Sequence, residues 1–157
     1  MVIGKPCKNL LPTDNPLDYV LGYTVGNDVS SRFWQLDNNR SGGQHGYAKS
    51  FDKFAPIGPL LCSTSQIPDP SKLNLKTFVN GVQKQITGLE DLIFDVPAII
   101  RHLSRGMTLR AGTIIMTGTP SGVAAFEKPP GWLRNGDLVE VEVDGIGKIA
   151  NRMAFEV

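Results

Sequence analysis

The stretch LNLKTFVNGVQKQIT, residues 73–87, decides the fold. Apolar side chains at Leu73, Leu75 and Val79 alternate with polar ones, as they do in a strand with one buried face. The pair Asn80-Gly81 follows at once, and this dipeptide suits the two positive φ angles of a tight hairpin turn. The stretch therefore predicts an antiparallel β-hairpin.

Three further stretches have the character of strands. Residues 138–153, LVEVEVDGIGKIANRM, alternate around Asp144-Gly145 and predict a second hairpin. Residues 19–25, YVLGYTV, are rich in aromatic and β-branched side chains and predict a buried strand. Residues 113–122, TIIMTGTPSG, begin with a β-branched run that indicates another strand and end in a Gly/Thr/Pro loop.

One segment has the pattern of a helix. Residues 95–105, DVPAIIRHLSR, place apolar side chains at helical spacing, with Asp95 as N-cap, Pro97 early and Gly106 as a stop. Residues 37–46, DNNRSGGQHG, are polar and glycine-rich and predict a loop. Many strands and one main helix favour an α+β fold, in which an antiparallel or mixed sheet folds on itself with the helix on one side.

The bulk composition limits the function classes. The chain has 157 residues, 41% of them hydrophobic, which fits a single domain over residues 1–157. A formal charge of +1 with interspersed signs favours neither a nucleic acid nor a membrane as partner. Cys7 and Cys62 have neither zinc-site spacing nor the number that a disulfide framework needs. The N-terminus lacks the apolar core of a signal peptide, so we expect a soluble, cytoplasmic protein.

The residues that carry chemistry begin with GNDVSSRFWQ, residues 26–35. Asp28 lies where the predicted strand 19–25 ends, and Arg32 and Gln35 follow within two helical turns. A turn explains Asp28 alone, because aspartate hydrogen-bonds its own backbone in such positions. A metal or substrate site explains the anion, the cation and the amide together. The residues themselves leave both interpretations open.

Several motifs in order resemble the fumarylacetoacetate hydrolase family. They are GYTVGNDVSSRFWQ, YAKSFDKFAPIGP, FVNGVQKQ, DLIFDVPAIIRHLSRGMTLRAGTIIMTGTPSGV and NGDLVEVEVDGIGKIANRM, and they extend from about residue 2 to the C-terminus. The combination of NDVSSR, KSFD and TGTPSGV is the most specific part of this likeness. The resemblance implies a mixed β-sandwich or β-roll of the fumarylacetoacetate hydrolase type, usually a homodimer.

The resemblance also implies an activity. Family members bind Mg²⁺ or Mn²⁺ and cleave, decarboxylate or isomerise small keto acids, and a chelated cation stabilises the enolate that forms. By this likeness, Asp28 is a metal ligand, and Arg32 binds the substrate. Gln35 orients substrate or water, and Lys49 of KSFD carries substrate charge or acts as an acid or base.

The same likeness places the TGTP loop at the substrate. Thr119 corresponds to the threonine at the substrate carboxylate, and Gly118 permits a close approach of the backbone. His45 departs from the family pattern, which has an aromatic residue there. It is either a drifted surface residue or an acid/base group that works near neutral pH. His102, within the predicted helix, is interpreted as structural.

One part of the family pattern lacks a counterpart. A Glu-x-Glu pair precedes the equivalent of VIGK in the family and supplies two metal ligands, whereas this chain starts MVIGK. We therefore expect a chain without the usual N-terminal segment, including the hydrolytic His/Glu dyad, and an impaired or altered metal site. Three hypotheses follow: an enolate-type enzyme that decarboxylates or isomerises rather than hydrolyses, a non-catalytic binding or interaction member, or a metal-independent biosynthetic isomerase or cyclase.

Overall fold

The stretch at residues 73–87 forms the predicted hairpin in the computed structural model, which describes residues 1–156. Strand β4 (Asn74–Val79) pairs antiparallel with β5 (Val82–Gly88). The turn residues Asn80 and Gly81 have φ angles of 51° and 78°, as a two-residue turn of this kind requires. The hairpin prediction is confirmed.

The second predicted hairpin joins the same sheet. Strand β6 (Leu138–Val143) pairs antiparallel with β4 and with β7 (Gly147–Arg152), so that the four-stranded sheet has the order β5-β4-β6-β7. Alternate residues of β6 are buried, and these are its valines at 139, 141 and 143. One face of this sheet therefore contributes a continuous apolar surface to the core.

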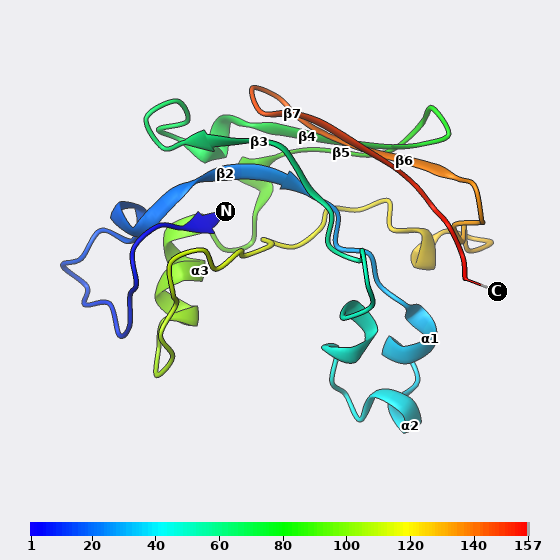
Figure 1. Cartoon of the computed structure of the whole chain (residues 1–157), viewed down its shortest axis with the longest axis horizontal. Helices are drawn as coiled ribbons and strands as arrows, with labels where there is room; N and C mark the ends of the chain where they lie inside the picture. The colour runs from blue at the N-terminus through cyan, green and yellow to red at the C-terminus, as the bar shows by residue number, and fades with distance from the viewer. Residues whose placement is uncertain (157) are drawn as a thin grey trace.

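A smaller antiparallel sheet lies against the first, in the order β1-β2-β3 (Figure 1). It consists of β1 (Val2–Ile3), β2 (Val20–Gly26) and β3 (Ile57–Ser63). β2 is the buried strand predicted at residues 19–25. Contacts of β2 with β6 and β7, and of β3 with β7, join the two sheets.

The prediction of a strand at the start of residues 113–122 is wrong, because this segment is extended but does not form a regular strand. Ile114 makes only an isolated antiparallel bridge to Val2, although backbone hydrogen bonds link this segment to the N-terminal residues. The amide of Ile3 donates to the carbonyl of Thr113 at 2.9 Å, and that of Ile115 donates to the carbonyl of Met1 at 2.9 Å. β-branched residues there adopt an extended conformation, but the partner β1 is too short to define a regular strand.

The main helix is α3 (Val96–Leu103), as predicted for residues 95–105. The Asp95 side chain caps it by accepting a hydrogen bond from the amide of Ala98 at 2.8 Å. Ile100 is fully buried and belongs to the same apolar core as Val25 of β2 and Val141 of β6. An α+β fold with two antiparallel sheets and one main helix is thus confirmed.

The segment between β2 and β3 leaves the sheets and extends away from them (Figure 1). It contains α1 (Arg32–Gln35), α2 (Asn38–Ser41) and the 3₁₀ helix η2 (Tyr47–Lys49). The loop predicted for residues 37–46 is therefore partly wrong, because Asp37 caps the single turn α2 by accepting from the amide of Asn39 at 2.9 Å. Local capping overrides the polar, glycine-rich composition there.

Four other 3₁₀ helices connect the remaining elements: η1 (Pro16–Tyr19), η3 (Pro70–Lys72), η4 (Leu89–Asp91) and η5 (Ala124–Phe126). Within residues 1–156, no helix combines the length and the apolar character that crossing a bilayer requires.

Candidate functional site

A cavity of about 1270 Å³ collects the residues that the sequence singled out. It lies between the end of β2, the segment that extends from the sheets, the face of β4 and β6, and the loop after residue 116. Every candidate residue lines it: Asp28, Arg32, Gln35, His45, Lys49, Gly118 and Thr119. Two segments some 70 residues apart in the chain, around residues 28–49 and 118–119, therefore share one space.

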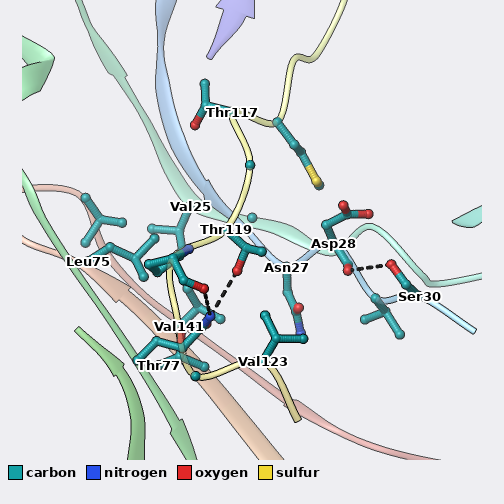
Figure 2. Close-up of a pocket in the computed structure, with 18 of the residues that line it drawn as sticks. Val25, Asn27, Asp28, Ser30, Leu75, Thr77, Thr117, Thr119, Val123 and Val141 are labelled. Atoms are coloured by element: carbon teal, nitrogen blue, oxygen red, sulfur yellow. Dashed lines mark hydrogen bonds between the residues drawn. The ribbon is translucent and has the colours of Figure 1, made fainter. Parts of the chain in front are cut away.

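Asp28 lies two residues beyond the end of β2, and backbone pairing fixes its position. The amide of Asn27 donates to the carbonyl of Pro56 at 3.1 Å, and the amide of Val29 donates to the carbonyl of Phe54 at 3.0 Å. The Asp28 carbonyl also accepts from the Ser30 hydroxyl at 3.2 Å, as Figure 2 shows. The carboxylate is exposed at the cavity and forms an ion pair with Lys49.

Lys49 lies on η2, and the backbone anchors that turn to the segment after Asp28. The amide of Ser31 donates to the carbonyl of Ala48 at 2.9 Å, and Ala48 itself is fully buried. The Lys49 ammonium donates to the Asp28 carboxylate and, at 3.0 Å, to the Ser30 hydroxyl. Because an ammonium has three N–H donors, one remains for a ligand in the cavity.

Arg32 and Gln35 form a pair on the single turn α1. The Arg32 guanidinium donates from Nη1 to the Gln35 Oε1. Both side chains are half-buried and line the cavity. The guanidinium has further N–H groups, which suit the two oxygens of a carboxylate. Gln35 accepts from Arg32 and thereby orients it, and its amide nitrogen can donate to a ligand or to water.

A chain of aromatic rings holds α1 against η2. Successive ring centroids lie 5.2 Å apart for Phe33 and Trp34, 5.1 Å for Trp34 and Tyr47, 5.3 Å for Tyr47 and Phe51, and 5.2 Å for Phe51 and Phe54. Edge-on and tilted aromatic contacts of this kind stabilise a fold beyond the area that they bury. They link the turn that carries Arg32 and Gln35 to the turn that carries Lys49.

The loop with Gly118 and Thr119 also lines the cavity, and Figure 2 shows the Thr119 side chain with its hydrogen bond. Gly118 has a φ of 102°, which favours glycine, and it is exposed. Gln85 of β5 donates to the Thr119 hydroxyl at 2.9 Å and to the Pro120 carbonyl at 3.1 Å. The sequence did not identify Gln85 as a site residue, because nothing in the alternation of its strand distinguishes it from Gln83.

The two histidines have different surroundings. His45 is exposed at the edge of the cavity, four residues before Lys49. His102 lies in the last turn of α3, and its side chain is exposed. The interpretation of His102 as a structural residue therefore cannot rest on burial of its ring.

The cavity is also lined by Tyr23, a phenol whose pKa is raised above its ordinary value. Burial raises the pKa of Tyr23, and the negative charge of Asp69 raises it further. Hydrogen bonds from the Ser71 side chain and backbone lower the pKa of Asp69, so this carboxylate stays ionised beside the phenol. Tyr23 and Asp69 both line the cavity, which gives it a neutral hydroxyl in addition to its cations.

The described residues do not form a Mg²⁺ or Mn²⁺ site on their own. A hard cation of this kind takes six or more oxygen ligands. Asp28 offers one carboxylate, and that carboxylate already pairs with the Lys49 ammonium. Within residues 1–156, no group of three or more His, Cys, Asp or Glu side chains could hold a metal ion. Asp28 therefore provides at most a single ligand among these residues.

Sequence comparison gives one matching family model and clear relatives. The model "Fumarylacetoacetate (FAA) hydrolase C-terminal" matches residues 1–154. The mitochondrial oxaloacetate tautomerase of Xenopus laevis is 43% identical over 150 residues, which is 96% of this chain and 46% of that protein. An oxaloacetate tautomerase of Bacillus subtilis is 41% identical over 153 residues, or 98% of this chain and 49% of that protein. The chain thus spans about half the length of these relatives.

Solved structures share the fold at similar coverage. A fumarylacetoacetate hydrolase from Exiguobacterium antarcticum has a TM-score of 0.90 at 37% identity, over 99% of this chain and 54% of that one. A maleylpyruvate hydrolase from Sphingobium, solved with manganese(II) and pyruvate, has a TM-score of 0.80 at 32% identity, over 98% of this chain and 51% of that one. The arrangement of both sheets is therefore one that known enzymes use.

Proposed function

This chain belongs to the fumarylacetoacetate hydrolase family, and on that premise we propose that it catalyses keto–enol tautomerisation of a small 2-oxo acid such as oxaloacetate. One observation carries the proposal: two cations, Lys49 and Arg32, share a cavity with the Thr119 hydroxyl. Two relatives that match nearly the whole chain are named oxaloacetate tautomerases, which supports this reaction over the other reactions of the family.

Charge stabilisation is the task of Lys49 in this proposal. When the carbon next to a ketone loses a proton, negative charge develops on the keto oxygen, and a preorganised donor lowers the free energy of that enolate. Lys49 is preorganised because Asp28 and Ser30 take two of its N–H groups and fix its ammonium. Its third N–H is the donor for the enolate oxygen.

Substrate orientation is the task of Arg32 and Thr119. The guanidinium of Arg32 is oriented by Gln35 and binds the carboxylate next to the ketone through its remaining N–H groups. The Thr119 hydroxyl, which lines the same cavity, binds the same carboxylate. Binding at two points holds the reacting carbon in one place, which lowers the entropic part of the barrier.

Proton transfer needs a group that both accepts and donates a proton. In tautomerisation the carbon loses one proton and the oxygen gains one, so the group returns to its starting state without another reactant. His45 is our candidate, because its imidazole lies at the edge of the cavity and imidazole exchanges protons near neutral pH.

The test is an assay of oxaloacetate tautomerisation. The enol form absorbs in the ultraviolet, so its decay is followed with and without the protein, and with and without Mg²⁺ or Mn²⁺. We expect acceleration by the wild type, and a loss on the order of 10²–10³-fold in kcat for His45→Ala if His45 moves the proton. His102→Ala is the matched control and should retain full activity. A wild type that fails to accelerate the reaction under any of these conditions would refute the proposal.

A non-catalytic, ligand-binding role is the second candidate. The lack of a three-ligand metal group among residues 1–156 favours it, since the maleylpyruvate hydrolase of similar fold was solved with manganese(II). Calorimetric titration with oxalate, a planar enolate mimic, separates the two. Oxalate binding together with turnover supports the enzyme, whereas oxalate binding without turnover supports the binding role.

We also propose that the protein is a homodimer. Leu60 and Leu61 of the edge strand β3 are 61% and 48% exposed, and Leu21 of the neighbouring β2 is 50% exposed. Neighbouring apolar side chains on an edge strand are a typical interface between copies. Analytical ultracentrifugation should give a dimer mass for the wild type and a monomer mass for Leu60→Glu. A monomeric wild type would contradict this.

A further inference from the structure

The side-chain amide of Gln85 fixes the direction of the Thr119 hydroxyl. Its nitrogen lies 3.1 Å from the Pro120 carbonyl and 2.9 Å from the Thr119 hydroxyl oxygen. A carbonyl oxygen only accepts, so the NH₂ group of the amide must face it. The two N–H donors of that group are then used by Pro120 and Thr119, and the Thr119 oxygen is the acceptor.

The single proton of the Thr119 hydroxyl is therefore directed away from Gln85. A hydroxyl that accepts from one partner can still donate to another. Since Thr119 lines the cavity, a ligand bound there can accept this proton. We propose that Gln85 is a positioning residue, which makes Thr119 a hydrogen-bond donor to a carboxylate oxygen of the substrate. This inference rests on the proposed function, because it assumes a carboxylate in the cavity.

Strand β5 contacts the loop after Gly118 at further points, so the position of Thr119 does not depend on the Gln85 hydrogen bonds alone. A Cβ atom on Gly122 would lie 2.0 Å from the carbonyl oxygen of Lys84, which shows how closely the loop backbone approaches the strand. The Lys84 ammonium also forms an ion pair with Glu127 at 3.0 Å. These contacts at Gly122 and Glu127, after Thr119 in the chain, add to the hydrogen bonds of Gln85 in holding the loop on β5.

The direction of the Thr119 hydroxyl proton decides whether this side chain attracts or repels a carboxylate ligand. A carboxylate ligand has only acceptor atoms, so it binds a hydroxyl proton and is repelled by hydroxyl lone pairs. Gln85→Glu replaces the NH₂ group by an acceptor, which would draw the Thr119 proton towards β5 and face the Pro120 carbonyl with a like partial charge. Gln85→Leu removes the donor without supplying an acceptor.

The experiment measures oxalate binding by calorimetry and oxaloacetate turnover for a set of variants. Gln83→Leu is the matched control, since Gln83 lies on the same strand, is exposed and does not line the cavity. We expect a rise in KM and in the oxalate Kd on the order of 10- to 100-fold for Gln85→Glu, a smaller rise for Gln85→Leu and none for Gln83→Leu. The value of kcat should change less than KM, because the carboxylate is bound equally in the ground and transition states.

A double-mutant cycle then separates a positioning role from a structural one. In a Thr119→Val background, Gln85→Leu should have no further effect on the oxalate Kd, and Thr119→Ser should restore binding. Additive effects, or Gln85 variants that bind like Gln83→Leu, would overturn the inference, with thermal melting to verify that each variant is folded. A wild type that does not bind oxalate would also overturn it, whereas oxalate binding without turnover would refute only the catalytic proposal.

Discussion

The Lys49 ammonium forms an ion pair with the Asp28 carboxylate, across 21 residues of chain. The sequence assigned these two residues to separate motifs. The structure joins them, because the segment after β2 folds back through its aromatic chain and returns Lys49 to the end of the strand. The charge of Asp28 thereby fixes the cation that the proposed reaction requires.

Replacement of this lysine tests its role in catalysis. We expect Lys49→Met to lower kcat for oxaloacetate tautomerisation by about 10²–10³-fold, because the developing enolate would lose its preorganised donor. Lys8→Met is the control, since Lys8 is exposed and does not line the cavity. Equal kcat values for the two variants, measured from the decay of enol absorbance, would remove Lys49 from the mechanism.

Two glycines of the substrate loop should respond differently to alanine. Both have positive φ angles, 102° at Gly118 and 95° at Gly122, but only a Cβ on Gly122 would clash with the Lys84 carbonyl. We expect Gly122→Ala to lower the free energy of unfolding by about 1–3 kcal/mol. Gly118→Ala should cost less, because nothing lies within 4 Å of a Cβ there. Urea titration measures both values, and a larger loss for Gly118→Ala would contradict the close packing of this loop on β5.

Stability should depend on pH through Asp137. Its pKa is held below the ordinary value of 3.8, chiefly by a hydrogen bond from the Asn80 side chain and also by one from the Arg134 amide. A carboxyl whose pKa is lower in the folded state stabilises the protein above the unfolded pKa and loses this contribution as the pH falls. We therefore expect Asp137→Asn to be less stable than the wild type at neutral pH.

The stability difference between Asp137→Asn and the wild type should then disappear on acidification through the pKa of Asp137. Urea titrations at a series of pH values from about 7 downwards measure this difference in the free energy of unfolding. Asn80→Gly is the companion variant, because it keeps a residue suited to the positive φ of the turn but removes the donor. In the Asn80→Gly background, the pH-dependent stabilisation that Asp137 provides should be smaller than in the wild type. If the stability difference between Asp137→Asn and the wild type stayed constant with pH, the charge of Asp137 would not contribute to stability.

Two isoleucines test the position of the core. Ile100 of α3 is fully buried, whereas Ile93 just before the helix is 91% exposed. We expect Ile100→Ala to lower the free energy of unfolding by about 2–5 kcal/mol through lost burial and a residual cavity. Ile93→Ala should change it by no more than about 0.5 kcal/mol. Similar losses for the two variants would mean that α3 packs with a different face.

Much of the fold could be predicted because its determinants are local. The turn at Asn80-Gly81, the alternation of β6 and the cap of α3 at Asp95 each depend on residues a few positions apart. The prediction was wrong where the outcome depends on a distant partner. Residues 113–116 have strand composition, yet they form only one isolated bridge because their partner, β1, is two residues long.

The candidate site divides in the same way. The sequence singled out seven residues, six through the resemblance and His45 as a departure from it, and all of them line one cavity. It did not identify Gln85, which a β-bulge in the pairing of β4 with β5 places on the opposite face of β5 from Gln83. Nor did it reveal the pairing of Lys49 with Asp28. The metal site remains a prediction from the resemblance, with Asp28 as its one candidate ligand in the described chain.

The sequence by itself determined the hairpins, the main helix, the family and the identity of the candidate residues. Backbone propensity, turn chemistry and side-chain alternation act over short distances and leave their pattern in the chain. Only the tertiary structure decided which side-chain N–H and O–H groups are positioned to donate a hydrogen bond to a ligand. Asn80 illustrates both: its place before glycine predicts the turn, but its side chain bonds Asp137, 57 residues away. Hydrogen-bond direction depends on which atoms meet in space, and that is set by packing between distant segments.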